Sequence, residues 1–205
     1  MYKTLVAIII AFLSTIAPAA MISVDQLNDS LDNYITNTII FETENDWLSS
    51  QLIVTLYTGT IYQDSIGGIA SPNPLLINSF PSLEFDTYVS NGILGDAVSA
   101  QGGAINLGGE IDMQFDELQL NVNWFSIDTT DVGILELARI TLSEDAIGIY
   151  KLWTTAVKDS IYEPPDVFIV ENIISNGIMI PEPSVIVLLC VDGLCILSKR
   201  QYYEK

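Results

Sequence analysis

The chain contains no histidine among its 205 residues. Histidine is the commonest acid–base group at neutral pH and the commonest metal ligand, so its absence removes both from the chemistry to be considered. Only two cysteines are present, Cys190 and Cys195, and both lie near the C-terminal end. The rest of the chain therefore offers no thiol nucleophile, no disulfide and no cysteine-based zinc site.

Basic residues are also scarce. Seven Lys and Arg stand against 26 Asp and Glu, which gives a formal net charge of −19. Binding to a nucleic-acid backbone needs clustered Lys and Arg, so we expect no nucleic-acid partner. The hydrophobic fraction of 49% is nevertheless too high for a disordered polyanion. The charge suits an exported protein that its acidic residues keep soluble, or one that binds cations or basic partners.

The N-terminal residues have the three parts of a secretory signal. Lys3 supplies a positive start, residues 5–16 are apolar, and small residues follow, with Ala17 and Ala19 at the two positions that a signal peptidase reads. The apolar run is short for a membrane span. We therefore predict a signal peptide of residues 1–19 that is cleaved after Ala19, with a retained N-terminal anchor as the alternative.

The C-terminal residues, 181–205, contain three elements in order. Pro181-Glu182-Pro183-Ser184 comes first, an apolar stretch over residues 185–197 follows, and Lys199 and Arg200 come next. The prolines hold an extended segment, and the basic pair favours the cytoplasmic side of a membrane. This arrangement resembles the PEP-CTERM sorting signal of exosortase substrates. The alternative is that residues 185–197, which include Asp192, form a buried terminal strand or helix.

The resemblance implies a processing route. It implies that the export machinery carries the chain across a membrane, that the C-terminal tail holds the precursor there transiently, and that an exosortase-like processing enzyme removes the tail. The expected localisation is the cell surface or the extracellular space.

Between the two signals, residues 46–180 have the pattern of short strands. Two-residue alternation marks residues 83–89, 118–124 and 134–142, the last with departures at Glu136 and Arg139. Residues 51–58 form a β-branched apolar run, and residues 148–157, 167–174 and 177–180 can supply further strands. These turn-bounded strands predict an all-β fold, an antiparallel β-sandwich of jelly-roll or Ig-like type. A signal helix would precede the sandwich and a short apolar helix would follow it.

Residues 20–45 are expected to form an N-terminal segment separate from this body. Leu27, Leu31 and Tyr34 have helix-like spacing. Asn and Thr interrupt the pattern often, so we expect at most a short helix there.

Several stretches of the body share a second resemblance. They are Asp46-Trp47 with residues 51–58, Ile61-Tyr62-Gln63, residues 81–89, Trp124-Phe125 and residues 138–143 followed by Gly148. Together they resemble planctomycete PEP-CTERM proteins of unassigned function. The resemblance covers most of residues 46–157 and implies an extracellular β-sandwich, without catalytic residues to transfer.

The carboxylates do not form a recognisable catalytic pair. Glu110, Asp112, Asp116 and Glu117 cluster in the sequence, but in a chain this acidic such clusters arise by chance. A serine nucleophile would lack a histidine base and the Gly-x-Ser-x-Gly elbow. We therefore expect that the protein is not an enzyme. Arg139 departs from the alternation of its strand, and we expect it to form an ion pair with Glu136 or with an acid on a neighbouring strand.

Calcium is the one cofactor that the sequence suggests. Ca²⁺ takes roughly six to eight oxygen ligands from carboxylates and backbone carbonyls. Asp128 and Asp131 lie in a polar turn that ends at Gly133, although no Asp-x-Asp-x-Asp-Gly loop is present. We expect either a weak calcium site at this turn or no cofactor.

The aromatic residues leave two functions open. Their positions inside strands favour core packing, and the alternative is a face on which sugars stack. We therefore expect an exported cell-surface or extracellular-matrix-associated structural or interaction protein. The first alternative is a carbohydrate-binding module on an extracellular β-sandwich, with extracellular polysaccharide as its partner, and an extracellular hydrolase comes third. The aromatic candidates are Trp47, Trp124, Trp153, Tyr57, Tyr62 and Tyr88.

Overall fold

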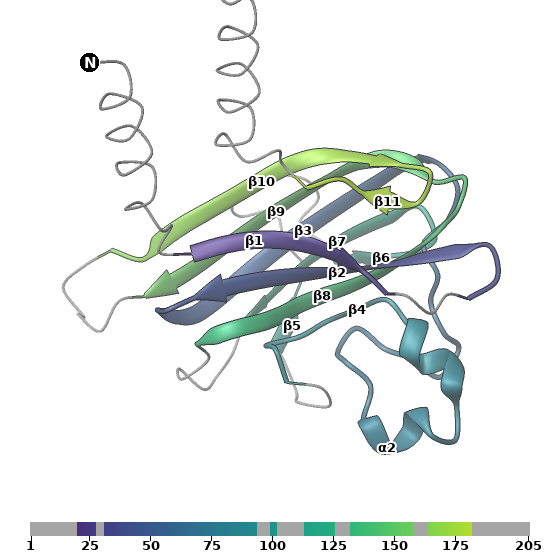
Figure 1. Cartoon of the computed structure of the whole chain (residues 1–205), viewed down its shortest axis with the longest axis horizontal. Coiled ribbons are helices and arrows are strands. Elements are labelled where there is room, and N and C mark those ends of the chain that lie inside the picture. Colours follow the sequence, from purple (N-terminus) through teal and green to yellow (C-terminus); the bar gives the residue numbers. More distant parts are fainter. Residues whose placement is uncertain are drawn as a thin grey trace, which may run out of the picture.

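The computed structural model of the chain describes residues 20–27, 31–93, 99–101, 113–125, 132–157 and 164–181. Most of these residues lie in strands, and the strands form two antiparallel sheets that pack face to face (Figure 1). The predicted antiparallel β-sandwich is confirmed, whereas the two predicted terminal helices lie outside the described residues. Within that described part, the model contains no helix with the length and apolar character needed to cross a membrane.

The first sheet has the strand order β1-β2-β8-β4, and the second has the order β11-β10-β9-β3-β7-β5, with β6 paired to β7. Two short helical segments, α2 (Pro74–Ile77) and the 3₁₀ helix η1 (Pro81–Phe85), precede β4. The strands are β1 (Ala20–Gln26), β2 (Tyr34–Thr43), β3 (Asp46–Thr58), β4 (Tyr88–Val89), β5 (Ser99–Gln101), β6 (Gln114–Phe115), β7 (Gln119–Phe125), β8 (Gly133–Ser143), β9 (Ile147–Val157), β10 (Asp166–Ser175) and β11 (Ile178–Met179).

Two pairs of consecutive strands interlock around the core. β2 leads into β3 and β8 leads into β9, and each connection passes from the first sheet to the second. β2 pairs with β8 in the first sheet, and β3 pairs with β9 in the second. Because both pairs are antiparallel, Thr43 lies beside Gly133 at one end and Thr58 beside Ile147 at the other. The two connections therefore close opposite ends of the sandwich.

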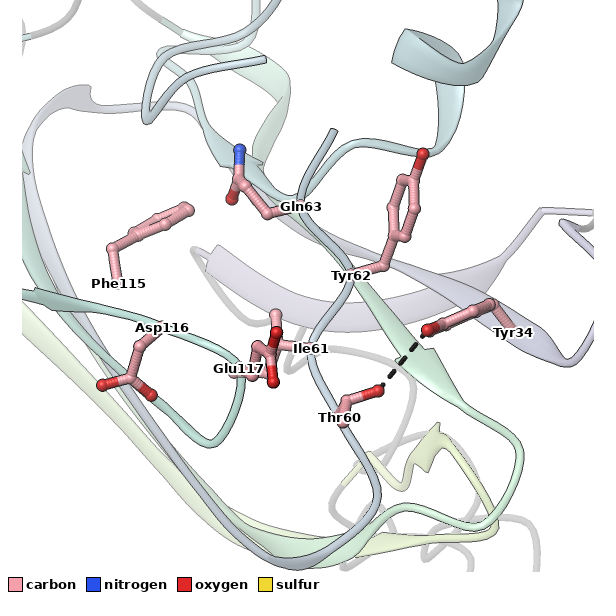
Figure 2. Close-up of a pocket in the computed structure, with 8 residues that line it drawn as sticks. All are labelled: Tyr34, Thr60, Ile61, Tyr62, Gln63, Phe115, Asp116 and Glu117. Atoms are coloured by element: carbon pink, nitrogen blue, oxygen red, sulfur yellow. Dashed lines mark hydrogen bonds between the residues drawn. The ribbon is translucent and has the colours of Figure 1, made fainter. Parts of the chain in front are cut away.

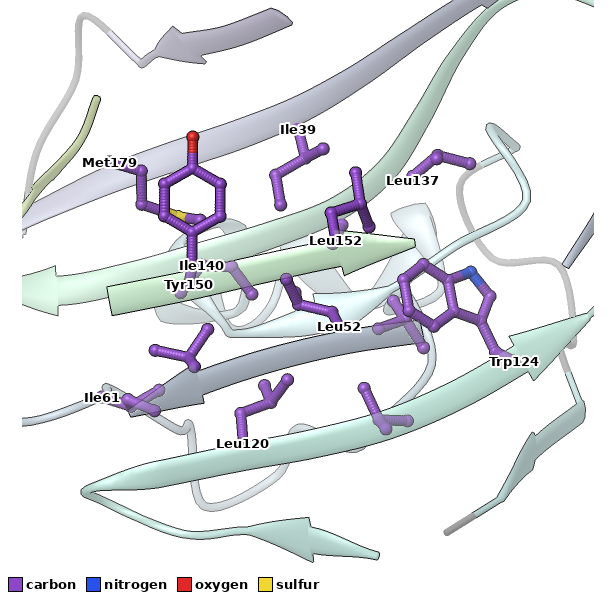
Figure 3. Packing of buried hydrophobic residues seen from close by; sticks show 14 of the residues in the cluster. Ile39, Leu52, Ile61, Leu120, Trp124, Leu137, Ile140, Tyr150, Leu152 and Met179 are labelled. Carbon is purple, nitrogen blue, oxygen red and sulfur yellow. The ribbon is translucent and has the colours of Figure 1, made fainter. Parts of the chain in front are cut away.

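The inward side chains of these strands form one apolar core. Figure 3 shows Ile39 and Leu137 from the first sheet facing Leu52 and Leu152 from the second. All four are fully buried. Burying a side chain of this size contributes about 1.5–3 kcal/mol to folding, so the alternating strand pattern is the main source of stability.

The described residues of 20–45 belong to the sandwich as the strands β1 and β2, and none of them lies in a helix. β1 pairs with β2 in the register Ala20↔Thr43 to Gln26↔Asn37. The β2 side chains Ile39 and Phe41 are fully buried in the core. The β-branched residues of β2 favour a strand, and pairing with two neighbouring strands outweighs the helix-like spacing of the residues before it.

The expected strand over residues 83–89 forms only at its end. η1 occupies Pro81–Phe85, and Tyr88–Val89 alone joins the first sheet as β4. Pro81 has no N–H to donate to a sheet, and the Asp86 N–H bonds back to the Leu83 carbonyl at 3.3 Å. Leu83 is buried, but it lies in the turn of η1 and not in a strand.

One buried amide joins the two sheets. Asn37 lies on the inward face of β2 and is fully buried. Its Nδ2 donates to the Gly177 carbonyl at 2.8 Å and to the Ile140 carbonyl at 3.3 Å, and its Oδ1 accepts from the Met179 N–H at 3.0 Å. The side chain thus satisfies backbone groups of the β10–β11 hairpin from across the core.

Asn37→Ala should lower the free energy of unfolding by on the order of 3 kcal/mol, because the Met179 N–H and the Gly177 carbonyl lose a buried partner. Urea unfolding measures the change. Asn172→Ala is the control, since its amide accepts only an exposed bond from the Ile173 N–H, and it should change stability by less than about 0.5 kcal/mol. Equal losses of unfolding free energy in the two variants would show that the buried hydrogen bonds of Asn37 do not stabilise the fold.

Candidate functional site

The segment after β3 crosses from the second sheet to the first and is bonded to both. The Ile61 N–H donates to the Glu117 carbonyl at 2.7 Å, which ties it to the turn between β6 and β7. The Tyr62 N–H donates to the Thr141 carbonyl at 2.8 Å, which ties it to β8. The Thr60 N–H donates to the Ser143 Oγ at 2.9 Å. The backbone of residues 60–62 is therefore held in place from two sides.

This segment forms a wall of a pocket of about 370 Å³ (Figure 2). Its volume falls within the roughly 300–1,000 Å³ of ligand sites. Figure 2 shows Tyr34 and Tyr62 on one side of the segment and the β6–β7 turn on the other. The two tyrosine rings are tilted, with centroids 5.3 Å apart. The residues that line the pocket are Tyr34, Thr60, Ile61, Tyr62, Gln63, Phe115, Asp116 and Glu117.

The acidic side of the pocket is a tight turn. The Asp116 Oδ1 accepts the N–H groups of Leu118 at 2.9 Å and Gln119 at 2.8 Å, so its carboxylate is fixed by the turn itself. Glu117 uses its backbone carbonyl to hold residue 61, and its side chain is exposed. The structure thus brings two members of the acidic sequence cluster into the pocket. The other two, Glu110 and Asp112, lie outside the described residues.

The pocket lining favours neutral, hydroxyl-rich ligands. No Lys or Arg is among the lining residues, so nothing there offsets the charges of Asp116 and Glu117. Carboxylates accept hydrogen bonds from hydroxyl groups, the Gln63 amide donates and accepts, and the tyrosine rings offer apolar faces. A phosphate or carboxylate ligand would meet like charge, whereas a polyol with one apolar face would not.

Tyr62 is held by an acid outside the pocket. Its hydroxyl donates to the Asp64 Oδ2 at 3.2 Å. Burial raises the pKa of Tyr62, and the neighbouring Asp64 charge raises it further, so the phenol stays protonated. The ring is therefore anchored at its polar tip while part of it remains exposed to the pocket.

Asp64 and Asp86 are neighbours with opposite pKa shifts. The fully buried Asp86 accepts the Asp64 N–H at 2.8 Å and the Gln63 Nε2 at 2.9 Å through Oδ1, while its Oδ2 has no partner among the described residues. Burial raises the pKa of Asp86 to about 6. Burial also acts to raise the pKa of Asp64, but hydrogen bonds from Ser82, the Ile66 N–H and Tyr62 outweigh it and leave the pKa below its ordinary value.

Residues 62–93, called here the edge segment, are attached to β8 through Arg139. The Arg139 Nη2 lies 3.0 Å from the Glu136 Oε1, and its Nη1 donates to the Glu84 carbonyl at 2.8 Å. The Tyr88 hydroxyl donates to Glu136 at 2.8 Å, and the guanidinium lies 5.2 Å from the centre of the Tyr88 ring. The predicted ion pair between Arg139 and Glu136 is confirmed. Its role is structural, because neither side chain lines the pocket.

The aromatic candidates divide between core and surface. Trp47, Trp124 and Tyr88 are fully buried, as the strand pattern predicted. Trp153 is half-buried and Tyr57 is exposed, and they do not adjoin, because Trp153 lies opposite Gln51 while Tyr57 is at the far end of β3. These two residues therefore form no aromatic line on the sheet. Tyr62 alone of the six candidates lines the pocket.

Tyr34 and Phe115 are the other aromatic residues of the pocket, and the sequence does not mark them as site residues. Tyr34 shares a helix-like spacing with Leu27 and Leu31, and Phe115 lies within the cluster of acidic residues. Three segments far apart in the chain form the pocket, so no local spacing marks its residues as a set.

The remaining predicted site residues lie mostly outside the described part of the chain. This holds for Ala17, Ala19, Glu182, Pro183, Ser184, Lys199, Arg200, Asp128 and Asp131. Pro181 is the last described residue, and it is exposed. Among the described residues, no group of three or more acidic side chains is placed to hold a metal ion. Calcium at Asp128 and Asp131 stays a prediction.

Comparison with known proteins finds no match among family models, curated proteins or solved structures. No ligand or activity of another protein therefore transfers to the pocket, and its chemistry follows from its own residues.

Asp86→Asn should raise the free energy of unfolding at pH 7.5 by on the order of 2 kcal/mol, because a buried charged carboxylate opposes folding. The folded-state pKa of about 6 exceeds the ordinary value of 3.8, so the folded form binds more protons between these values. Protonation of Asp86 should therefore stabilise the wild type as the pH falls from about 6 to about 4, and the difference in unfolding free energy between the variant and the wild type should shrink. Urea unfolding of both proteins at pH 7.5 and 4.5 measures this difference.

Asp64→Asn is the matched control and should have the opposite sign. Its lowered pKa means that the charged form is stabilised in the folded state, so the variant should be less stable at pH 7.5. If both substitutions shift the free energy of unfolding in the same direction, the opposite pKa shifts of Asp64 and Asp86 are refuted.

Proposed function

We propose that this chain is an exported structural and interaction protein of the cell surface or extracellular matrix, sorted through a PEP-CTERM signal at residues 181–205. The observation that carries the proposal is that every described strand lies between the two predicted processing sites. β1 begins at Ala20, directly after the predicted signal-peptide cleavage. At the other end, the Ile180 N–H bonds to the Ile173 carbonyl at 3.1 Å, and its carbonyl accepts the Tyr150 hydroxyl at 2.8 Å.

The sorting motif starts at the next residue, Pro181. Pro181 is exposed, which suits recognition of the motif by an exosortase-like processing enzyme. Removal of residues 1–19 and of the residues beyond Pro181 leaves every described strand in place. The export machinery and this enzyme are thus the first partners of the chain, and the tail gives the precursor a transient membrane association.

Protein from the native host should have an intact mass that corresponds to loss of the signal peptide and of both cysteines. Pro183→Ala should block the C-terminal step and leave a chain that ends at Lys205. Pro164→Ala is the control, because Pro164 is an exposed proline outside the motif, and it should be processed as the wild type is. A wild-type C-terminus at Lys205 in that host would refute the sorting proposal.

A carbohydrate-binding role is the second candidate, and the pocket favours it. Its lining combines tyrosine faces with carboxylates and an amide, and it contains no basic residue. Aromatic rings pack on the apolar face of a sugar ring, while the carboxylates and the amide bond its hydroxyl groups. The ligand class is a neutral polysaccharide, because a uronic acid polymer would meet Asp116 and Glu117.

Tyr62→Ala should weaken binding to a neutral glucan by about tenfold or more, because the ring provides the stacking face of the pocket. Affinity electrophoresis with glucan in the gel measures the dissociation constant, and an alginate gel should give no retardation. Tyr57→Ala, which removes an exposed tyrosine outside the pocket, should bind like the wild type. No retardation of the wild type by a panel of neutral polysaccharides would exclude this role.

A further inference from the structure

β10 lies beside the short strand β11 at one end of the order of the second sheet, and among the described strands β11 pairs with the C-terminal end of β10 alone (Figure 1). It turns into β11 through Asn176 and Gly177, both at positive φ (52° and 73°), as a two-residue hairpin turn requires. Ser175 pairs with Ile178, and the Ile180 N–H bonds to the Ile173 carbonyl. This pattern shows that odd-numbered residues of β10 direct their backbone groups toward the edge.

The free part of this edge is short and has defined limits. Among the described residues, none hydrogen-bonds to the edge-facing backbone groups of Val167, Ile169 and Glu171. On one side of these residues, Pro165 has no N–H to donate. On the other side, the Ile173 N–H is bonded to the Asn172 Oδ1 at 2.9 Å. The free edge is therefore limited to residues 167–171, and Ile169 is its midpoint.

The side chains of this edge are apolar and locally neutral. Val167 is 50% exposed and Ile169 is 59% exposed. Glu171 is the single charged residue of the free edge, and it pairs with Lys151 of β9 at 2.8 Å. Soluble proteins usually protect such edges with lysine, proline or inward-pointing charge, because an open apolar edge recruits another strand. In a chain with a net charge of −19, the single acidic side chain of this edge is therefore balanced by a lysine.

We propose that the free edge of β10 pairs with the same edge of a second copy of this chain, antiparallel and about a two-fold axis through Ile169. In this register Val167 faces Glu171 of the second copy, and Ile169 faces Ile169 of the second copy. All the free edge-facing residues then exchange N–H···O=C bonds. Moving the axis by one residue places Glu171 opposite Pro165, or Val167 opposite the already bonded Ile173, and loses bonds in either case.

The charges of the edge agree with a second copy as the occupant. The two-fold axis separates the two Glu171 side chains and places each beside an apolar residue, so like charges do not meet directly. The net charge of each copy still repels the other over longer distances, so association should strengthen with ionic strength. The contact joins the edge-facing residues Val167, Ile169 and Glu171 of each copy, far fewer than the about 20–30 residues a side of a standard stable interface, so we expect a weak dimer that forms at high protein concentration.

Site-specific cross-linking tests the register. Ile169→Cys is introduced into the full chain with Cys190→Ser and Cys195→Ser, which leaves it as the one thiol. Facing Cα atoms lie about 5.5 Å apart, within reach of a disulfide, so mild oxidation should yield a covalent dimer. Val167→Cys is the matched control, because the proposed register holds the two copies of residue 167 roughly 13 Å apart. Equal cross-linking of both variants, or none at residue 169, would overturn the proposal.

Sedimentation velocity tests the association without a cross-linker. The wild-type chain should show a dimer fraction that rises with salt. Ile169→Lys should shift it to monomer, because two ammonium groups would face each other at the axis. Ile134→Lys adds the same charge at a residue of β8 that is 72% exposed, and it should leave the dimer fraction unchanged. Thermal melts confirm that both variants fold, and a wild-type monomer at every salt and protein concentration would refute the interface.

Discussion

A β-bulge in β8 is the constraint on which the edge segment and the pocket depend. The register between β2 and β8 shifts between Ile39 and Ile40, so that Leu137 is an extra residue on β8. Without the bulge, Glu136 and Arg139 would point to opposite faces of the sheet, because side chains three residues apart alternate. With it, both lie on the outer face, while Leu137 and Ala138 both enter the core.

Arg139, which the bulge places on the outer face, holds the edge segment that carries Tyr62 of the pocket. Leaving a buried guanidinium unpaired would cost several kcal/mol, so its ion pair with Glu136 and its bond to the Glu84 carbonyl anchor the middle of the edge segment to β8. The start of that segment is held by Asp86, which accepts bonds from Gln63 and from the Asp64 N–H. These anchors place the Tyr62 ring at the pocket. Burial raises the pKa of Asp86, so this arrangement disfavours its charged form.

The acidic character of the chain has different effects in different places. At the pocket, carboxylates without basic neighbours select against anionic ligands. At the β10 edge, the pairing of Glu171 with Lys151 leaves a neutral apolar strip that a second copy can pair with. The segment proposed as a sorting signal begins at an exposed proline, Pro181. The second proposed function and the proposed edge pairing together would give the chain a sugar-binding pocket and weak self-association.

The all-β class, most strand positions and the Arg139–Glu136 pair were predictable from the sequence, because side-chain alternation and opposite charges are local properties. The strands of residues 20–43 and the turn at Pro81–Phe85 were not, since sheet pairing outweighed a helix-like spacing in one case and proline prevented a strand in the other. Of the pocket, the sequence singled out Tyr62, Asp116 and Glu117 without joining them. Only the tertiary structure brought them beside Tyr34, because the contacts between these segments depend on the strand order and on a bulge, and neither leaves a pattern in any one stretch of sequence.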